Sequence, residues 1–184
     1  VVCSTALWDL NRLTLTAGYD HANVWSTSQS FTNSEDHASE QLFARAGYQI
    51  HTALTAGLEA SAGYSRYDQA ILNDNANYSA GLYADWQPGQ AFHVQIRGGD
   101  AISRFQQTST SIQTADLNSW YFGLTIDHQP TESLSYNLAI GHEIQPGIQA
   151  DVIEDSYCRL GLQWKILKDL TFGTDASYTH GNQG

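Results

Sequence analysis

The sequence predicts an all-β chain of about ten long strands that run up and down. Alternation is clearest in Leu54–Ser65, where every even position is apolar or aromatic and every odd position is polar, charged or glycine. Successive side chains of a strand point to opposite faces, so this segment gives one apolar and one polar face. The connections alternate between tight turns and polar loops of roughly ten residues or more. We therefore predict an antiparallel up-and-down transmembrane β-barrel, whose tilted strands need about nine to eleven residues to cross a bilayer.

The same alternation locates each strand and each connection. After a strand end at 1–8, it marks segments 13–20, 42–50, 54–65, 78–86, 92–97, 120–127, 134–141, 159–166 and 170–178. Tight turns are predicted near residues 10, 52, 88, 131 and 168, and longer loops near 26–39, 67–77, 106–117 and 145–155. Residues 1–184 thus form a single barrel segment. Because its first and last strands both have their free ends on the long-loop side, we expect it to be an internal part of a larger barrel, with at least about twelve strands.

Charged residues inside the predicted strands share the polar face. An Arg or Lys that faces lipid at mid-depth costs about 2–4 kcal/mol, so a membrane barrel must turn such side chains inward. The residues that we expect to line the lumen are Arg45, Glu59, Asp85, Arg97, Asp127, Arg159, Lys165 and Asp175. Asp20 follows the same pattern. This mixture of both charge signs would keep a wide lumen wet and set a transverse field across it.

Aromatic residues on the apolar face concentrate near the strand ends. Two belts of Tyr and Trp are typical of the two interfaces of a membrane. The predicted interface aromatics are Tyr19, Tyr64, Tyr78, Trp86, Trp120, Trp164, Phe172 and Tyr178. Between the belts the apolar face consists of Ala, Leu, Ile and Val.

The composition of the chain indicates which classes of partner and ligand it can bind. A net charge of −11 disfavours nucleic acid, since phosphate binding requires clustered Lys and Arg. Cys3 and Cys158 form no metal or redox motif, and two unpaired thiols are the simpler interpretation. His142, Glu143 and the acids Asp151, Glu154 and Asp155 offer ligands for a hard cation, although an exposed acidic loop is more often merely solvated. We predict neither a metal site nor a cofactor.

These features together resemble the bacterial outer-membrane β-barrel proteins, in the broad sense that includes porins. The Ala-Gly-Tyr repeats at 17–19, 46–48 and 62–64 and the Trp86-Gln87-Pro88 turn fit such barrels. One departure is the end of the chain, 180–184, which lacks the aromatic residue that usually closes the last strand of these proteins. The resemblance implies a Gram-negative outer-membrane location and a lipid bilayer as partner. It leaves a partner protein or a homo-oligomer open.

Three functions fit the pattern. The first is a porin-like channel for passive transport of small polar solutes or ions. The second is a non-conducting structural barrel, a scaffold, anchor or sheath for a partner protein, in which the inward charges pair and fill a narrow lumen. The third is an enzyme that uses Asp20 and His21 at the outer rim. We predict no enzyme, because the chain has neither Gly-x-Ser-x-Gly nor His-Glu-x-x-His.

Two other folds also alternate. A soluble β-sandwich acting as a binding module would have shorter strands and a bulkier core face, and it gives no reason for aromatic belts. A propeller would suit the hairpin period of roughly forty residues and the Trp8-Asp9 dipeptide, but each blade needs four short strands.

Overall fold

The described residues form one antiparallel sheet of ten strands in sequence order. The computed structural model describes residues 2–24, 36–68, 73–106, 116–145 and 153–183. The strands are β1 (Val2–Leu10), β2 (Leu13–Val24), β3 (His37–His51), β4 (Leu54–Tyr67), β5 (Asp74–Gly89), β6 (Phe92–Gln106), β7 (Leu117–Thr131), β8 (Leu134–Gln145), β9 (Ile153–Leu167) and β10 (Leu170–Gln183). The all-β, up-and-down prediction is confirmed. The described strands form neither the two sheets of a sandwich nor the separate blades of a propeller.

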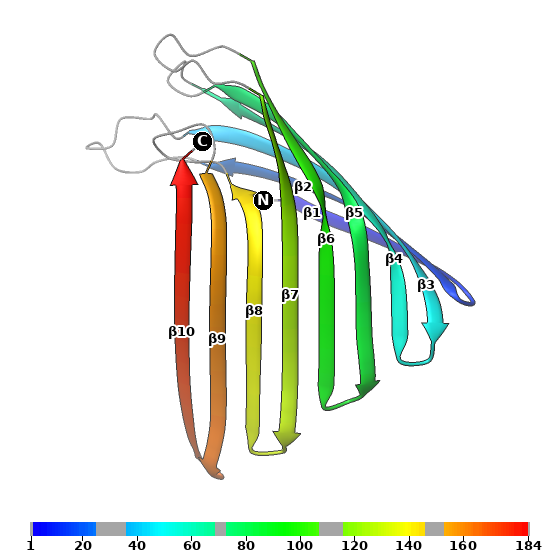
Figure 1. Ribbon diagram of the computed structural model, residues 1–184, viewed down its shortest axis with the longest axis vertical. Helices are drawn as coiled ribbons and strands as arrows, with labels where there is room; N and C mark the ends of the chain where they lie inside the picture. Colours follow the sequence, from blue (N-terminus) through cyan, green and yellow to red (C-terminus); the bar gives the residue numbers. More distant parts are fainter. Residues whose placement is uncertain (1, 25–35, 69–72, 107–115, 146–152, 184) are drawn as a thin grey trace.

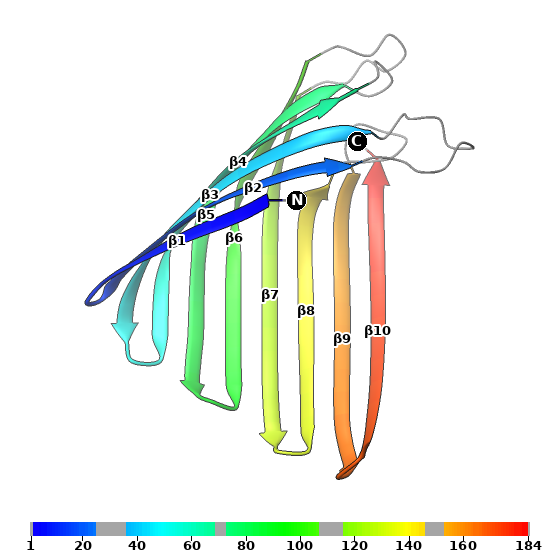
Figure 2. The ribbon, with the colours of Figure 1, turned by 180° about the vertical axis from the view of Figure 1, so that it is seen from behind.

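The sheet is strongly curled, and it is open between β1 and β10, which do not pair with each other. Figures 1 and 2 show β1–β5 crossing obliquely over one side of β6–β10, with the tight turns together at one end. We call this the turn end. The opposite end, where β2 ends at Val24 and β3 begins at His37, we call the loop end. Both marked chain ends lie toward the loop end (Figure 1).

The five tight turns lie at 11–12, 52–53, 90–91, 132–133 and 168–169. Asn11 has a φ of 60°, and Asn tolerates this left-handed conformation better than most residues. Neighbouring hairpins are joined at the turns: the Gln49 N–H donates to the Arg12 carbonyl (2.7 Å), and the Gln87 N–H donates to the Ala53 carbonyl (2.8 Å). The turn predicted near 88 lies at 90–91, because β5 continues to Gly89 through a register shift after Trp86.

At the loop end the strands are longer than the sequence predicts. β5 begins at Asp74, inside the predicted loop 67–77, and side-chain hydrogen bonds hold its polar start in the sheet. Asp74 Oδ1 accepts from the Tyr67 N–H (2.9 Å), and Ser103 Oγ donates to Asn77 Oδ1 (2.7 Å). Hydrophobic alternation is absent there, so it gave no signal for these strand ends. The rest of the predicted loops, at 25–35, 69–72, 107–115 and 146–152, lies outside the described residues.

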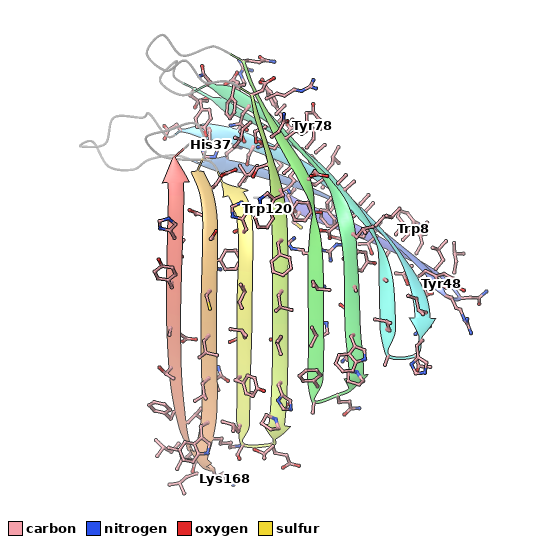
Figure 3. All side chains as sticks on the ribbon, in the orientation of Figure 1. Trp8, His37, Tyr48, Tyr78, Trp120 and Lys168 are labelled. Atoms are coloured by element: carbon pink, nitrogen blue, oxygen red, sulfur yellow. The ribbon has the colours of Figure 1, made fainter. Side chains whose placement is uncertain are left out.

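The two faces of the sheet differ in chemistry throughout. On one face, the outer face, Ala46, Leu58 and Leu82 are neighbours across β3, β4 and β5, and Leu58 and Leu82 are 61% and 64% exposed. Figure 3 shows the outer-face aromatics Tyr78 and Trp120 toward the loop end, and Lys168 at the turn end. Within the described residues no second layer covers the outer face. The other face, the inner face, carries hydroxyls, amides and charges.

The outer face is not entirely free of charge, which corrects the sequence analysis. Residues on the outer register that carry charge are Glu40, Arg66, Asp74, Asp100, Arg104 and Glu154. All lie toward the loop end of their strands. Asp74 and Glu154 fall in predicted loops. The other four lie beyond the predicted strands 42–50, 54–65 and 92–97, which are longer in the structure; β6, for example, continues to Gln106.

Candidate functional site

An ion pair lies on the inner face near the middle of β3 and β4. Arg45 and Glu59 are direct cross-strand partners. Two guanidinium nitrogens of Arg45 contact the same carboxylate oxygen of Glu59, with Nε–Oε2 at 3.0 Å and Nη2–Oε2 at 2.8 Å. The Glu59 side chain is only 10% exposed. Charge-assisted hydrogen bonds of this kind are roughly twice as strong as neutral ones.

Tyr121 reaches the same carboxylate from three strands away. Its hydroxyl donates to Glu59 Oε1 at 2.9 Å, so the side chain crosses β6 and β5 from β7 to β4. The residues between the two ends of this contact are Gly99 and Gly81, in one row with Glu59 and Tyr121. A Cβ at Gly81 would collide with the Tyr121 hydroxyl and with the Gly98 carbonyl. The absence of a side chain at Gly81 therefore makes room for the tyrosine, whereas a Cβ at Gly99 would collide with the Ala80 carbonyl.

Tyr83 and Arg97 extend this cluster along the inner face. The Arg45 guanidinium carbon lies 5.1 Å from the centroid of the Tyr83 ring, within the range of a cation–π interaction. The side chain of Arg97 lies along Gly123 of the neighbouring strand β7, where a Cβ would come within 3.0 Å of Arg97 Nε. Together with these neighbours, the Arg45–Glu59–Tyr121 cluster extends over the inner face from β3 to β7.

A cavity of about 590 Å³ on the inner face is lined partly by this cluster. Toward the loop end its lining is rich in uncharged polar side chains: Ser61, Ser65, Asn75, Asn77, Ser79 and Ser103. Neighbouring strands share hydrogen bonds there, as between the Ser61 and Ser79 hydroxyls at 2.7 Å. The inner wall is therefore polar without being strongly charged in this region.

A second polar cluster lies near the turn end. His93 Nε2 is 3.0 Å from Asp85 Oδ2, and His93 Nδ1 is 3.6 Å from Asp127 Oδ2. The Gln95 side-chain amide donates to the same Asp85 oxygen at 3.2 Å. A neighbouring cavity of about 490 Å³ is lined by His93, Asp127 and Asp175, among others. The histidine thus links the carboxylates of β5 and β7.

The residues predicted to line a lumen all lie on the inner register. The structure pairs Arg45 with Glu59, links Asp85 to Asp127 through His93, and leaves Lys165 and Asp175 exposed. The Arg159 guanidinium lies over the Tyr157 ring at 4.6 Å. Tyr121, Tyr83 and His93 were not predicted to belong to these clusters. For Tyr121 a signal existed, since a tyrosine on the polar register is matched by glycines on the two preceding strands.

The predicted interface aromatics all lie on the outer register, and aromatic contacts connect the group at the turn end. Trp86 and Phe92 pack edge to face with ring centroids 5.6 Å apart, and Phe92 and His128 do so at 5.1 Å. His128 Nδ1 and the Tyr136 hydroxyl share a hydrogen bond of 2.7 Å. His128 and Tyr136 were not predicted to belong to this belt. At the loop end the Trp120 ring stacks on the His142 ring, with ring centroids 4.2 Å apart.

The other candidate sites are not assembled. Asp20 and His21 are adjacent in β2 and point to opposite faces, and His21 instead lies 3.9 Å from Glu40. Of the proposed cation ligands, Glu143 and Asp155 are cross-strand partners on the inner face, whereas His142 and Glu154 lie on the outer face and Asp151 lies outside the described residues.

The described residues contain neither a metal-binding cluster nor a disulfide. Among the residues that the structure describes, no group of three or more His, Cys, Asp or Glu side chains could hold a metal ion. Cys3 and Cys158 are both free. In the described part of the chain, no helix is long and apolar enough to cross a membrane.

Comparison with known proteins gives one structural similarity. Neither a protein-family model nor a curated protein matches the chain. Among solved structures, the chain is similar to the P. putida toluene transporter TodX, with 13% sequence identity and a TM-score of 0.46. The similarity covers 97% of this chain and 66% of that transporter. At this identity the similarity concerns the fold alone.

Proposed function

We propose that the chain forms the wall of a Gram-negative outer-membrane β-barrel that passes small polar solutes or ions. The observation that carries this proposal is the two-faced single sheet. Large apolar side chains such as Leu58 and Leu82 stand exposed on the outer face, while Arg45, Glu59 and Tyr121 lie on the inner face. Each Å² of apolar surface moved out of water contributes roughly 25 cal/mol, so a lipid environment stabilises this arrangement. The bilayer is thus the proposed partner of the outer face.

The aromatic belts support a membrane position. Trp86, Phe92 and Tyr136 lie on the outer face near the turn end, and Tyr78 and Trp120 lie toward the loop end. Tyr and Trp favour the two membrane–water interfaces, because each combines an apolar ring with a polar group. The apolar band between the belts would then span the hydrocarbon.

The unpaired edges of β1 and β10 are relevant to the width of the lumen, because they determine whether further strands are needed to close the barrel. In hydrocarbon an unpaired backbone group costs several kcal/mol, so both edges must find partner strands for the sheet to reside in a membrane. We propose that further strands complete the barrel. Barrel diameter grows with strand number, and a wide barrel leaves an aqueous lumen beside this inner face.

A non-conducting structural barrel remains the second candidate. The observation that favours it is that some inner charges, such as Lys165 and Asp175, stand exposed, so an opposing wall or a partner protein in the lumen could pair with them. Such a barrel would be a scaffold or sheath, with its lumen filled by side chains or by a partner protein.

Conductance in a planar bilayer tests the proposal. We expect the purified full-length protein to insert and to give stable current steps of defined size. Arg97→Gln should shift the reversal potential toward cation preference, whereas Lys168→Gln, in a tight turn, should leave it unchanged. A folded, inserted protein that gives no current would support the structural barrel. A protein that never enters the bilayer would contradict both barrel functions.

A further inference from the structure

Two of the basic residues differ from the others in their location. The chain has eight Lys and Arg residues. Those on the inner register are Arg45, Arg97, Arg159 and Lys165. Arg12 and Lys168 occupy tight turns. The remaining two, Arg66 and Arg104, are both exposed on the outer face toward the loop end.

The sheet register brings these two arginines close together. Tyr64 is the cross-strand partner of Ala76, and Ala76 is the partner of Arg104, so Tyr64 and Arg104 share one row. Arg66 lies two residues beyond Tyr64 on β4. With strands about 4.8 Å apart and a rise of about 3.4 Å per residue, the two Cα atoms are roughly 12 Å apart. The long side chains of Arg66 and Arg104 therefore flank a strip of the outer face about 12 Å wide.

On the outer face, the residues next to the arginines on the side of the turn end are apolar and aromatic. Tyr64, Tyr78 and Ile102 are all exposed on the same face, and Ile102 is the cross-strand partner of Tyr78. Figure 3 shows Tyr78 at this end of the sheet, remote from Lys168. A lipid acyl chain could lie along these residues while its headgroup stays level with the arginines, as amphipathic side chains at an interface require.

The acidic residues of the outer face nearest to the two arginines are Glu40, Asp74 and Asp100. Glu40, the cross-strand partner of Tyr64, lies 3.9 Å from His21 Nδ1. Neither Arg66 nor Arg104 forms an ion pair with a described residue. Asp74 is buried and accepts hydrogen bonds from the Tyr67 N–H at 2.9 Å and from the Tyr64 hydroxyl at 3.5 Å. Asp100 lies four residues from Arg104 along β6, about 13 Å away at the rise of an extended strand.

We propose that Arg66 and Arg104 bind the phosphate groups of a membrane lipid in the leaflet on the loop side, with Tyr64, Tyr78 and Ile102 contacting its acyl chains. This inference rests on the proposed membrane location. Guanidinium forms bidentate hydrogen bonds with phosphate, and its attraction is strengthened next to an apolar surface. In a chain with a net charge of −11, Arg66 and Arg104 form no ion pair with a described residue and stand on the proposed lipid-facing side. Binding an anionic lipid headgroup is the simplest role for two such cations.

The test is a lipid titration of the full-length protein folded in neutral dodecyl-maltoside micelles, followed by native mass spectrometry. The probe is diphosphoryl lipid A, compared with the same lipid after phosphate removal. One basic residue near a membrane surface contributes about five-fold to affinity, so Arg66→Gln with Arg104→Gln should weaken binding about thirty-fold. The matched control, Arg12→Gln with Lys168→Gln, removes the same charge at the turn end and should leave binding unchanged.

Several outcomes would overturn the inference. Equal weakening in both double variants would mean that only net charge matters. Equal binding of the dephosphorylated lipid would exclude recognition of phosphate, and competition by inorganic phosphate at the same concentration as the lipid would indicate a free-anion site. The variant Arg66→Lys with Arg104→Lys keeps both charges but loses the bidentate geometry of the guanidinium groups, so it should bind the lipid more weakly than the unaltered protein and more tightly than the glutamine variant. This intermediate affinity separates loss of binding from loss of folding. A chain that folds only without detergent would contradict the membrane proposal itself.

Discussion

Removing the Tyr121 hydroxyl tests whether the contact across four strands stabilises the inner wall. Tyr121→Phe keeps the ring above Gly99 and Gly81 and deletes only the hydrogen bond to Glu59 Oε1. A hydrogen bond to a charged group contributes about 1.5–3 kcal/mol. Glu59 is 10% exposed, so water replaces the lost donor poorly. We expect the free energy of unfolding to fall by an amount in that range.

The measurement is a double-mutant cycle with Glu59→Ala, which removes both acceptor oxygens, by urea unfolding of the protein in lipid vesicles followed by tryptophan fluorescence. The coupling energy isolates the pair from other effects of either substitution. Tyr83→Phe is the control, because the Tyr83 hydroxyl forms no hydrogen bond to a described residue and its loss should change stability by less than about 0.5 kcal/mol. A coupling energy below about 0.5 kcal/mol, or equal effects of the two Tyr→Phe changes, would refute the reasoning.

Two further substitutions test the packing and the two faces of the sheet. Gly81→Ala should destabilise the sheet by about 1–3 kcal/mol in the same unfolding assay, because its Cβ collides with Tyr121 and with the backbone. Gly63→Ala, whose Cβ would meet nothing closer than 3.5 Å, is its control, and equal losses would contradict the close approach. Leu58→Arg on the outer face should cost about 2–4 kcal/mol in a bilayer, whereas Gln95→Arg on the inner face should cost little; the reverse order would place lipid on the other side.

The strands and their facing could be predicted from the sequence, and the polar clusters could not. Period-two alternation in segments such as 54–65 is a local property, so it identifies a strand and both of its faces without knowledge of the fold. Tyr121 and Glu59 are 62 residues apart in sequence. Their contact depends on the registers of three successive strand pairs, and a slip of one residue in any of them would turn one partner to the other face.

The outer-face charges were missed for a different reason. Arg66 and Arg104 lie where the hydrophobic pattern fades, and the sequence alone gives no ground for extending a strand through polar residues. In the structure, cross-strand backbone pairing and bonds such as Ser103–Asn77 continue the sheet there. Alternation thus predicts where a strand crosses an apolar layer better than where the strand ends.

The direction of the polar contacts bears on the choice between a channel and a filled barrel. In a narrow, filled barrel inward charges find their partners across the lumen, on the opposite wall. Here the partners lie beside one another on the same wall: Arg45 and Glu59 on adjacent strands, and His93 between the flanking strands of Asp85 and Asp127. Even the longest contact, from Tyr121 to Glu59, runs along the sheet over two glycines. A wall that satisfies its own charges needs no opposing wall close by, and this favours the channel over the sheath.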